Sequence, residues 1–102
     1  KRLSPYVQFQ KPINKKVIPS YWIITILFDN LTSKDRVIDS LSKNKIEHRP
    51  LFHPVDELSF YETDKSLHRT KNIYNKGICL PSYPELSKLE LDRICNIIIE
   101  NL

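Results

Sequence analysis

The run YWIITILF, residues 21–28, limits the possible folds of this chain more than any other feature of its sequence. Its aromatic and β-branched side chains favour a strand over a helix. Because the apolar residues follow one another without alternation, the pattern is typical of an interior strand that is covered on both faces. We therefore expect residues 21–28 to form the central strand of a sheet, with Trp22 in the core.

The residues before this strand contain Pro5, Pro12 and Pro19. Proline lacks a backbone N–H and fixes φ, so this density of prolines excludes a continuous helix or a central strand. The sequence therefore predicts an extended lead-in over residues 1–20 and a folded domain over residues 21–102.

A first helix is predicted after this strand. Asp29 and Asn30 favour a turn, and either Thr32 or Ser33 offers an N-cap oxygen. We expect the helix to end near Asn44, because asparagine tolerates the left-handed conformation that ends many helices. The side chains expected on its apolar face are Val37, Ile38 and Leu41.

The sequence of the middle of the chain predicts shorter secondary-structure elements. Residues 46–48 predict a short strand before Pro50, and residues 50–62 predict a loop with one turn of helix, since they show no clear period. A second helix is predicted over residues 64–76. Two of its side chains are expected to face inward, namely Leu67 and Tyr74.

Gly77 is the only glycine of the chain and comes directly after the second predicted helix. A residue at positive φ commonly ends a helix, so we expect a left-handed backbone at this glycine. Residues 78–80 then predict a third short strand, which Pro81 ends.

The last helix has the clearest signals in the sequence. Ser87 and Glu90 form the S-x-x-E pattern of a capping box, and Leu86 and Leu91 have the spacing of a hydrophobic staple. The order strand, helix, strand, helix, strand, helix, without an internal repeat, predicts a small α/β or α+β domain. The apolar stripe that is expected to pack on the sheet consists of Leu91, Ile94, Cys95, Ile98 and Leu102.

Length and charge exclude several classes of function. A chain of 102 residues is expected to form one domain with a single core. Sixteen Lys and Arg against twelve Asp and Glu give a net charge of +4, but these basic residues are scattered. A nucleic-acid-binding surface shows a clustered basic stripe, so we expect no nucleic-acid partner. The longest apolar run, residues 21–28, is too short to span a membrane, so we expect a soluble cytoplasmic protein.

Cys79 and Cys95 have neither a CxxC partner nor a histidine at a zinc-binding spacing, so we expect no metal site. Two reduced thiols are typical of a cytosolic protein. Cys79 lies inside a predicted apolar strand, where burial raises the pKa of a thiol and makes it a poor nucleophile.

Five segments of the chain, taken in order, resemble a known family. They are PSYWIITILF (19–28), SKDRVIDSL (33–41), KIEHRPLFHPV (45–55), FYE (60–62) and KGICLPSYPELSKLELDRICNII (76–98). This ordered set resembles the C-terminal small domain of the DegT/DnrJ/EryC1/StrS family, the pyridoxal-phosphate-dependent aminotransferases that act on nucleotide sugars. The resemblance implies a short, mostly antiparallel sheet of about three strands packed by three helices, as in the C-terminal domain of fold-type I transferases.

The resemblance also implies a parent enzyme larger than this chain. In the family, the catalytic lysine and the residues that hold pyridoxal phosphate belong to a large domain, so we assign no catalytic or cofactor-binding residue here. We expect this chain alone to bind no cofactor and to be inactive. The implied partners are the large domain of the same protein, a nucleotide-sugar substrate, an amino-acid donor that is usually glutamate, and a second copy in a homodimer.

The chain departs from the family pattern at two positions. Lys45 stands where the family commonly has glycine before isoleucine, and Asp56 stands where it often has histidine after the second loop proline.

Arg49 is the first candidate for a substrate contact, because a guanidinium can hold a carboxylate or a phosphate with two hydrogen bonds. The alternative is an ion pair with Glu47 or Asp56. His53 is a second candidate, since imidazole can hydrogen-bond a sugar hydroxyl or a phosphate. The alternative for His53 is an exposed loop histidine without a site role.

Phe52 and Tyr61, together with Phe60, are candidates for stacking on a nucleotide base. The alternative is that these aromatic rings anchor their proline-rich loop to the core.

Two functions follow from these observations. The first is that of a C-terminal domain of a sugar-nucleotide aminotransferase, as used in surface-polysaccharide or deoxyaminosugar biosynthesis. The second is that of a free-standing α/β binding or interaction domain without catalysis. A large exposed apolar surface on the domain favours the first, because the large domain would cover it.

Overall fold

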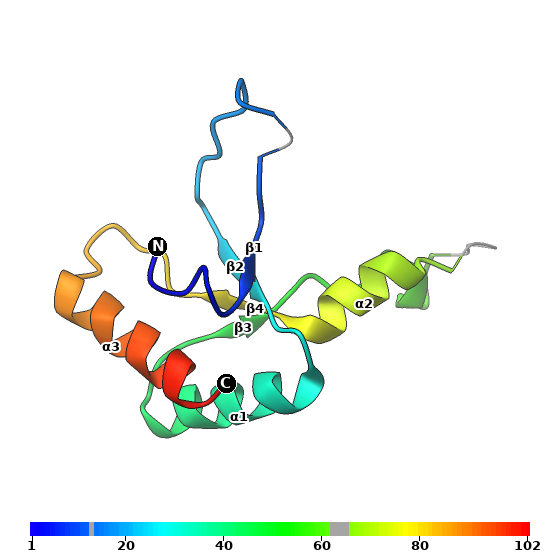
Figure 1. Cartoon of the computed structure of the whole chain (residues 1–102). Helices are drawn as coiled ribbons and strands as arrows, with labels where there is room; N and C mark the ends of the chain where they lie inside the picture. Colours follow the sequence, from blue (N-terminus) through cyan, green and yellow to red (C-terminus); the bar gives the residue numbers. More distant parts are fainter. Residues whose placement is uncertain (13, 62–65) are drawn as a thin grey trace.

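The computed structural model describes residues 1–12, 14–61 and 66–102. Four strands pair in the order β1-β2-β4-β3, and every neighbouring pair is antiparallel. The described residues also form three α-helices and one short 3-10 helix, η1 (Figure 1). In chain order the elements are β1 (Gln8–Phe9), β2 (Ile24–Leu27), α1 (Leu31–Lys43), β3 (Arg49–Pro50), η1 (Val55–Glu57), α2 (His68–Lys76), β4 (Gly77–Leu80) and α3 (Lys88–Glu100).

One face of the sheet is covered and the other is open. In the register of β2 with β4, Ile26 lies opposite Ile78, and both side chains are buried. The helices α1 and α3 pack on this face (Figure 1). The neighbouring pair, Thr25 and Cys79, points to the opposite face and is only half-buried. The other buried apolar side chains of the core are Leu3, Val7, Phe28, Val37, Leu41, Ile94, Ile97 and Ile98.

The predicted central strand is confirmed as an interior strand, but it is shorter than expected and only one of its faces is covered. The ladder begins at Ile24, so Tyr21 and Trp22 lie before it. Trp22 is 74% exposed, which shows that the prediction of a core tryptophan was wrong. The physical reason is that the chain leaves the strand conformation before Ile24: Tyr21 has a left-handed backbone, with φ 53°, so Trp22 lies beyond the end of the ladder and is not placed under the helices.

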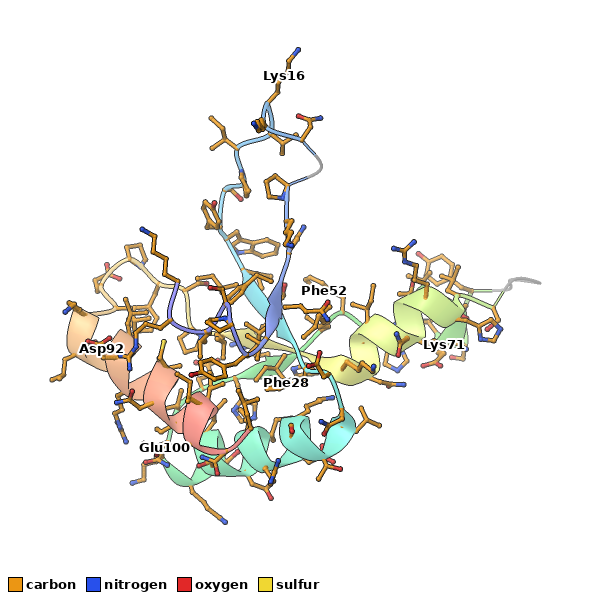
Figure 2. The ribbon with its side chains drawn as sticks, in the orientation of Figure 1. Lys16, Phe28, Phe52, Lys71, Asp92 and Glu100 are labelled. Carbon is orange, nitrogen blue, oxygen red and sulfur yellow. The ribbon has the colours of Figure 1, made fainter. Side chains whose placement is uncertain are left out.

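The lead-in contributes to the fold. Leu3 and Val7 are buried in the core, and β1 adds a fourth strand beside β2. Between β1 and β2 the described residues form an arm that projects from the body of the domain, with Lys16 at its tip (Figure 2).

The strand predicted at residues 46–48 lies three residues later, at Arg49–Pro50. There Arg49 pairs with Cys79 and Pro50 with Ile78. Proline is tolerated because β3 is an edge strand with a partner on one side only. The helical turn predicted in the following loop is confirmed as η1, and the predicted residues 62–65 lie outside the described part of the chain.

The apolar face of α1 and its end at Asn44 are confirmed, but the N-cap residue and the left-handed residue differ from the prediction. Asn30 is the N-cap, and its side chain accepts the Ser33 N–H at 2.8 Å. At the other end Asn44 has φ −88°, and the left-handed residue is Lys45, with φ 56°. The Lys45 N–H donates to Ser42 and the Ile46 N–H donates to Leu41, which is the Schellman pattern of helix ends.

Gly77 is needed for space and not for a left-handed backbone. Its φ is −110°, which any residue adopts. A Cβ at this position would collide with the Leu51 side chain and would lie 2.8 Å from Cδ2 of Leu27. The absence of a side chain therefore lets β4 start beside two leucines.

The capping box of α3 is confirmed: Ser87 Oγ accepts the Glu90 N–H, and Glu90 accepts the Ser87 N–H at 2.8 Å. The apolar stripe holds at Ile94 and Ile98, with Ile97 buried as well. Leu91 is 43% exposed and adds little to the core. By contrast, no residue of α2 is buried, and Leu67 before it is exposed while Tyr74 is half-buried.

Replacing Lys45 by glycine is expected to raise the free energy of unfolding by about 1 kcal/mol, because a left-handed backbone costs an L-residue with a side chain roughly that much. Urea denaturation of the chain measures this. Lys43→Gly, the same change inside the last turn of α1, is the matched control and is expected to lower stability by about 1 kcal/mol. Equal effects of the two changes would contradict the left-handed role of position 45.

Candidate functional site

Two grooves adjoin the uncovered part of the sheet. The first, here called the edge groove, has a volume of about 810 Å³ and lies between β3, the end of α1 and the segment that joins β4 to α3. The second, here called the sheet groove, has a volume of about 640 Å³ and lies over the open face of the sheet, between the arm and α2. Four residues line both grooves, so the two share a wall: Trp22, Ile23, Phe52 and Cys79.

Arg49 lines the edge groove from strand β3. Its Nε and Nη2 donate to one oxygen of Glu47 at 3.0 and 2.7 Å, which is one of the two ion pairs considered as alternatives. The Arg49 side chain is nevertheless 77% exposed, so water screens this pair and part of the guanidinium faces solvent. The arginine can therefore meet an anion at the mouth of the groove.

Phe52 is 77% exposed and follows β3 by two residues. It lies on the open side of the sheet, whereas Phe28 lies on the helix side (Figure 2). The expectation that this ring anchors its loop to the core does not describe its position. Phe52 and Trp22 instead give the shared wall of the two grooves an aromatic surface.

His53 and Tyr61 line neither groove within the part of the chain that the structure describes. The His53 ring packs on Tyr74 of α2, with ring centroids 5.0 Å apart, and its Nε2 lies 3.5 Å from Glu57. Tyr61 is exposed and packs on Phe60. Of the four candidates, the structure therefore brings together only Arg49 and Phe52.

Asp56 does not point into either groove. Its side chain is 4% exposed, accepts the Leu67 N–H at 3.0 Å and lies 3.2 Å from Nζ of Lys71. The Leu67 N–H and the Lys71 ammonium hold the pKa of the Asp56 carboxyl below its usual 3.8, although burial acts in the other direction. The hydrogen bonds to Asp56 and Glu57 raise the pKa of Lys71.

Sequence reasoning missed Trp22, Arg93 and Lys71 as contributors to this region. Arg93 lines the edge groove and donates to the Asn44 carbonyl oxygen at 3.1 Å, so its guanidinium joins α3 to the end of α1. No pattern of neighbouring residues predicts the contacts of Arg93 and Lys71, since Asn44 and Asp56, their partners, are distant in sequence. Trp22 carried a usable signal, because Pro19 and Ser20 lie three and two residues before it and favour a turn over a strand.

Cys79 has the raised pKa that was expected, caused by partial burial, with the charge of Arg49 acting against it. The described residues contain no group of three His, Cys, Asp or Glu side chains arranged to hold a metal ion. Among the described helices, none combines the length and the apolar character that a membrane crossing requires.

Comparison with known proteins matches residues 3–99 to the DegT/DnrJ/EryC1/StrS aminotransferase family. The GDP-perosamine synthase of Escherichia coli O157:H7 is 32% identical over 101 residues, which cover 98% of this chain and 28% of that protein. The GDP-perosamine synthase of Vibrio cholerae is 37% identical over 84 residues, which cover 78% of this chain and 23% of that protein. The chain thus matches about a quarter of the length of these relatives.

Two solved structures have the same fold. The aminotransferase TlmJ from Streptoalloteichus hindustanus superposes with a TM-score of 0.86 at 17% identity, over 98% of this chain and 28% of that chain. Helicobacter pylori PseC, an aminotransferase involved in the biosynthesis of pseudoaminic acid, gives a TM-score of 0.77 at 21% identity, over 95% of this chain and 27% of that chain.

The lowered pKa of Asp56 predicts a specific acid sensitivity. A carboxyl with a lowered pKa in the folded state contributes its full stabilisation above its unfolded pKa and loses it as the pH falls through the folded one. We therefore expect Asp56→Asn to destabilise the chain above pH 3.8 and the difference from the wild type to shrink below that pH. Urea denaturation at a series of pH values measures this, with Asp39→Asn, an exposed carboxylate of α1, as control. A difference that stays constant with pH would contradict the assignment.

Proposed function

Since this chain belongs to the DegT/DnrJ/EryC1/StrS aminotransferase family, we propose that it acts as the C-terminal domain of a pyridoxal-phosphate-dependent sugar-nucleotide aminotransferase. The observation that carries this proposal is the combination of two matches. The chain aligns over almost all of its own length with one GDP-perosamine synthase, yet over only 28% of the length of that enzyme. The fold of the domain recurs as a similar share of two solved aminotransferases.

The proposed role of the domain is to close the active site beside a large domain. The open face of the sheet supports this role, because it carries exposed aromatic side chains that an isolated soluble domain would rarely present to water. Tyr21, Trp22 and Phe52 are all exposed and line the sheet groove. We propose that the large domain packs against this face and that the edge groove, with Arg49, opens toward the substrate.

The described residues do not fit a complete pyridoxal phosphate site. The lysine that binds this cofactor lies in an enclosed site, where desolvation lowers its pKa. None of the described lysines is buried, and Lys71 has its pKa raised by its acidic neighbours. When it is bound in the parent enzyme, the cofactor supplies the electron sink for amino transfer. The residues of this chain bind and orient substrate groups beside it.

The substrates that we propose for the parent are a keto-sugar nucleotide and an amino-acid donor, with glutamate as the expected donor. We also propose a homodimeric parent, because the family to which the chain belongs is expected to assemble in this way. The proposed compartment is the cytoplasm, which is supported by the two unpaired thiols.

The alternative, a free-standing binding domain, has no specific observation in its favour. Such a domain would cover its sheet with its own residues or expose a polar face. The exposed aromatic wall at Trp22 and Phe52 instead favours a domain that is completed by another one.

A chimaera tests the proposed function. The matched 101 residues of the Escherichia coli GDP-perosamine synthase are replaced by the corresponding residues of this chain, and formation of GDP-perosamine is measured. We expect an active chimaera in which Arg49→Met lowers kcat/KM for the sugar nucleotide about 10- to 100-fold, because a charge-assisted contact is lost, and in which Arg49→Lys has a smaller effect.

Arg69→Met is the matched control for this experiment, because Arg69 is an exposed arginine of α2 that lines neither groove. A folded but inactive chimaera would contradict the proposed function. Equal activities of the Arg49→Met and Arg69→Met chimaeras would contradict the role of Arg49 alone.

Because we propose that the cofactor-binding lysine lies in the large domain, we expect the isolated chain to form no stoichiometric lysine adduct with pyridoxal phosphate. Mass spectrometry after reduction with borohydride measures this, with free lysine as the positive control. One adduct per chain at a single lysine would contradict the proposal that the cofactor site lies outside this domain.

A further inference from the structure

The helix α2 is held in place by polar contacts more than by burial. None of its side chains is buried, although three of them, Thr70, Ile73 and Tyr74, line the sheet groove. Its far end continues directly into β4, and Lys34 of α1 donates its Nζ to the Asn75 carbonyl oxygen at 2.6 Å. What holds its near end is the loop that follows β3.

Asp56 is the centre of these contacts. Its Oδ2 accepts the Leu67 N–H, directly before α2, and lies 3.2 Å from Nζ of Lys71 in the first turn of that helix. The same ammonium lies 3.2 Å from Oε1 of Glu57. The Asp56 side chain is almost fully enclosed, and its Oδ1 has no hydrogen-bond partner among the described residues. A carboxylate enclosed in this way depends on Lys71 for its charge balance.

His53 extends the same network toward the grooves. Its Nε2 lies 3.5 Å from Oε2 of Glu57, and its ring packs on Tyr74 one helical turn beyond Lys71. Within the described residues, the charged and titratable side chains of this network are His53, Asp56 and Glu57 from the loop and Lys71 and Tyr74 from α2, and of these Lys71 contacts Asp56 directly. Together they connect residues 53–57 to both the first and the second turn of the helix.

The network bears on the grooves because the residues beside it are the groove walls. Phe52, next to His53, lines both grooves, and Tyr74 lines the sheet groove. Figure 2 shows Lys71 on α2 and Phe52 on the open side of the sheet. A shift of the loop relative to α2 would move both walls at once.

We propose that Asp56 and Lys71 are positioning residues, whose ion pair locks the loop after β3 and helix α2 into one unit and thereby places Phe52 at the junction of the two grooves. Only the statement that the grooves contact substrate rests on the proposed function. The lock itself is a property of this chain.

The orientation of Asp56 agrees with a positioning role. The side chain of Asp56 points toward Lys71 and lines neither groove. The position serves here to place Phe52 and not to touch a ligand in either groove.

Hydrogen exchange of the whole 102-residue chain, read by mass spectrometry, tests the lock. Lys71→Met removes the ammonium and leaves Asp56 enclosed without its partner. We expect exchange over residues 52–57 and 68–74 to accelerate about tenfold or more, because the local opening becomes easier, while exchange in α3 stays unchanged. Lys71→Arg, which keeps the charge, is expected to restore protection to within about twofold. Lys88→Met is the matched control, since Lys88 of α3 is 93% exposed and its Nζ lies 3.9 Å from Asp92, so this change removes a surface ion pair outside the network.

The emission of Trp22 gives a second readout, because it is the only tryptophan and lines both grooves beside Phe52. We expect Lys71→Met to change its quenching by acrylamide, and Lys88→Met to leave it unchanged. Unchanged exchange over residues 52–57 together with unchanged quenching in Lys71→Met would overturn the proposal. If Lys71→Met does not fold, Asp56→Asn and Glu57→Gln are measured in its place, and protection equal to that of the wild type in both would overturn it.

The same substitution in the chimaera separates this inference from the proposed function. Lys71→Met is expected to raise KM for the sugar nucleotide at least threefold with kcat within about twofold, because the groove wall shifts while the reacting groups stay in place. A chimaera that is inactive without any substitution contradicts the proposed function, and the exchange experiment still decides the lock. An active chimaera in which Lys71→Met alters kcat and leaves KM unchanged contradicts the positioning role.

Discussion

The antiparallel pairing of β2 with β4 is the contact on which the rest of the fold depends. Its register places Ile26 opposite Ile78, and both side chains are buried beneath α1 and α3. The strands β1 and β3 each pair with only one member of this central pair, so neither has a place in the sheet without it. Because successive side chains of a strand point to opposite faces, the same register also places Thr25 and Cys79 on the open face.

Burial on one side only explains why the domain presents so much aromatic surface. Two helices supply the apolar partners of the covered face, whereas the third, α2, lies beside the sheet and buries none of its residues (Figure 1). The exposed rings of Trp22 and Phe52 then form the wall that two grooves share. This exposed aromatic wall is the surface against which we propose that a large domain packs.

Polar contacts add to burial at several ends of the secondary-structure elements. The C-terminus of α1 ends in a Schellman pattern at a lysine, although the left-handed conformation there suits glycine better. The near end of α2 relies on Asp56 and Lys71, and the N-terminal segment is joined to α3 by Arg2, which lies 2.6 Å from Asp92. The single glycine of the chain is used for close packing beside Leu51, where any side chain would collide.

Local patterns in the sequence determined the elements whose signals lie within a few neighbouring residues. The interior strand, the apolar face of α1, the helical turn in the loop and the capping box of Ser87 and Glu90 are specified by adjacent side chains and backbone groups, so they were predictable. Only the tertiary structure decided which face of the sheet stays open. It also decided that Arg49 and Phe52 share a groove while His53 and Tyr61 do not, and that Asp56 pairs with Lys71. These outcomes depend on contacts between residues distant in sequence, for which the chain carries no local signal.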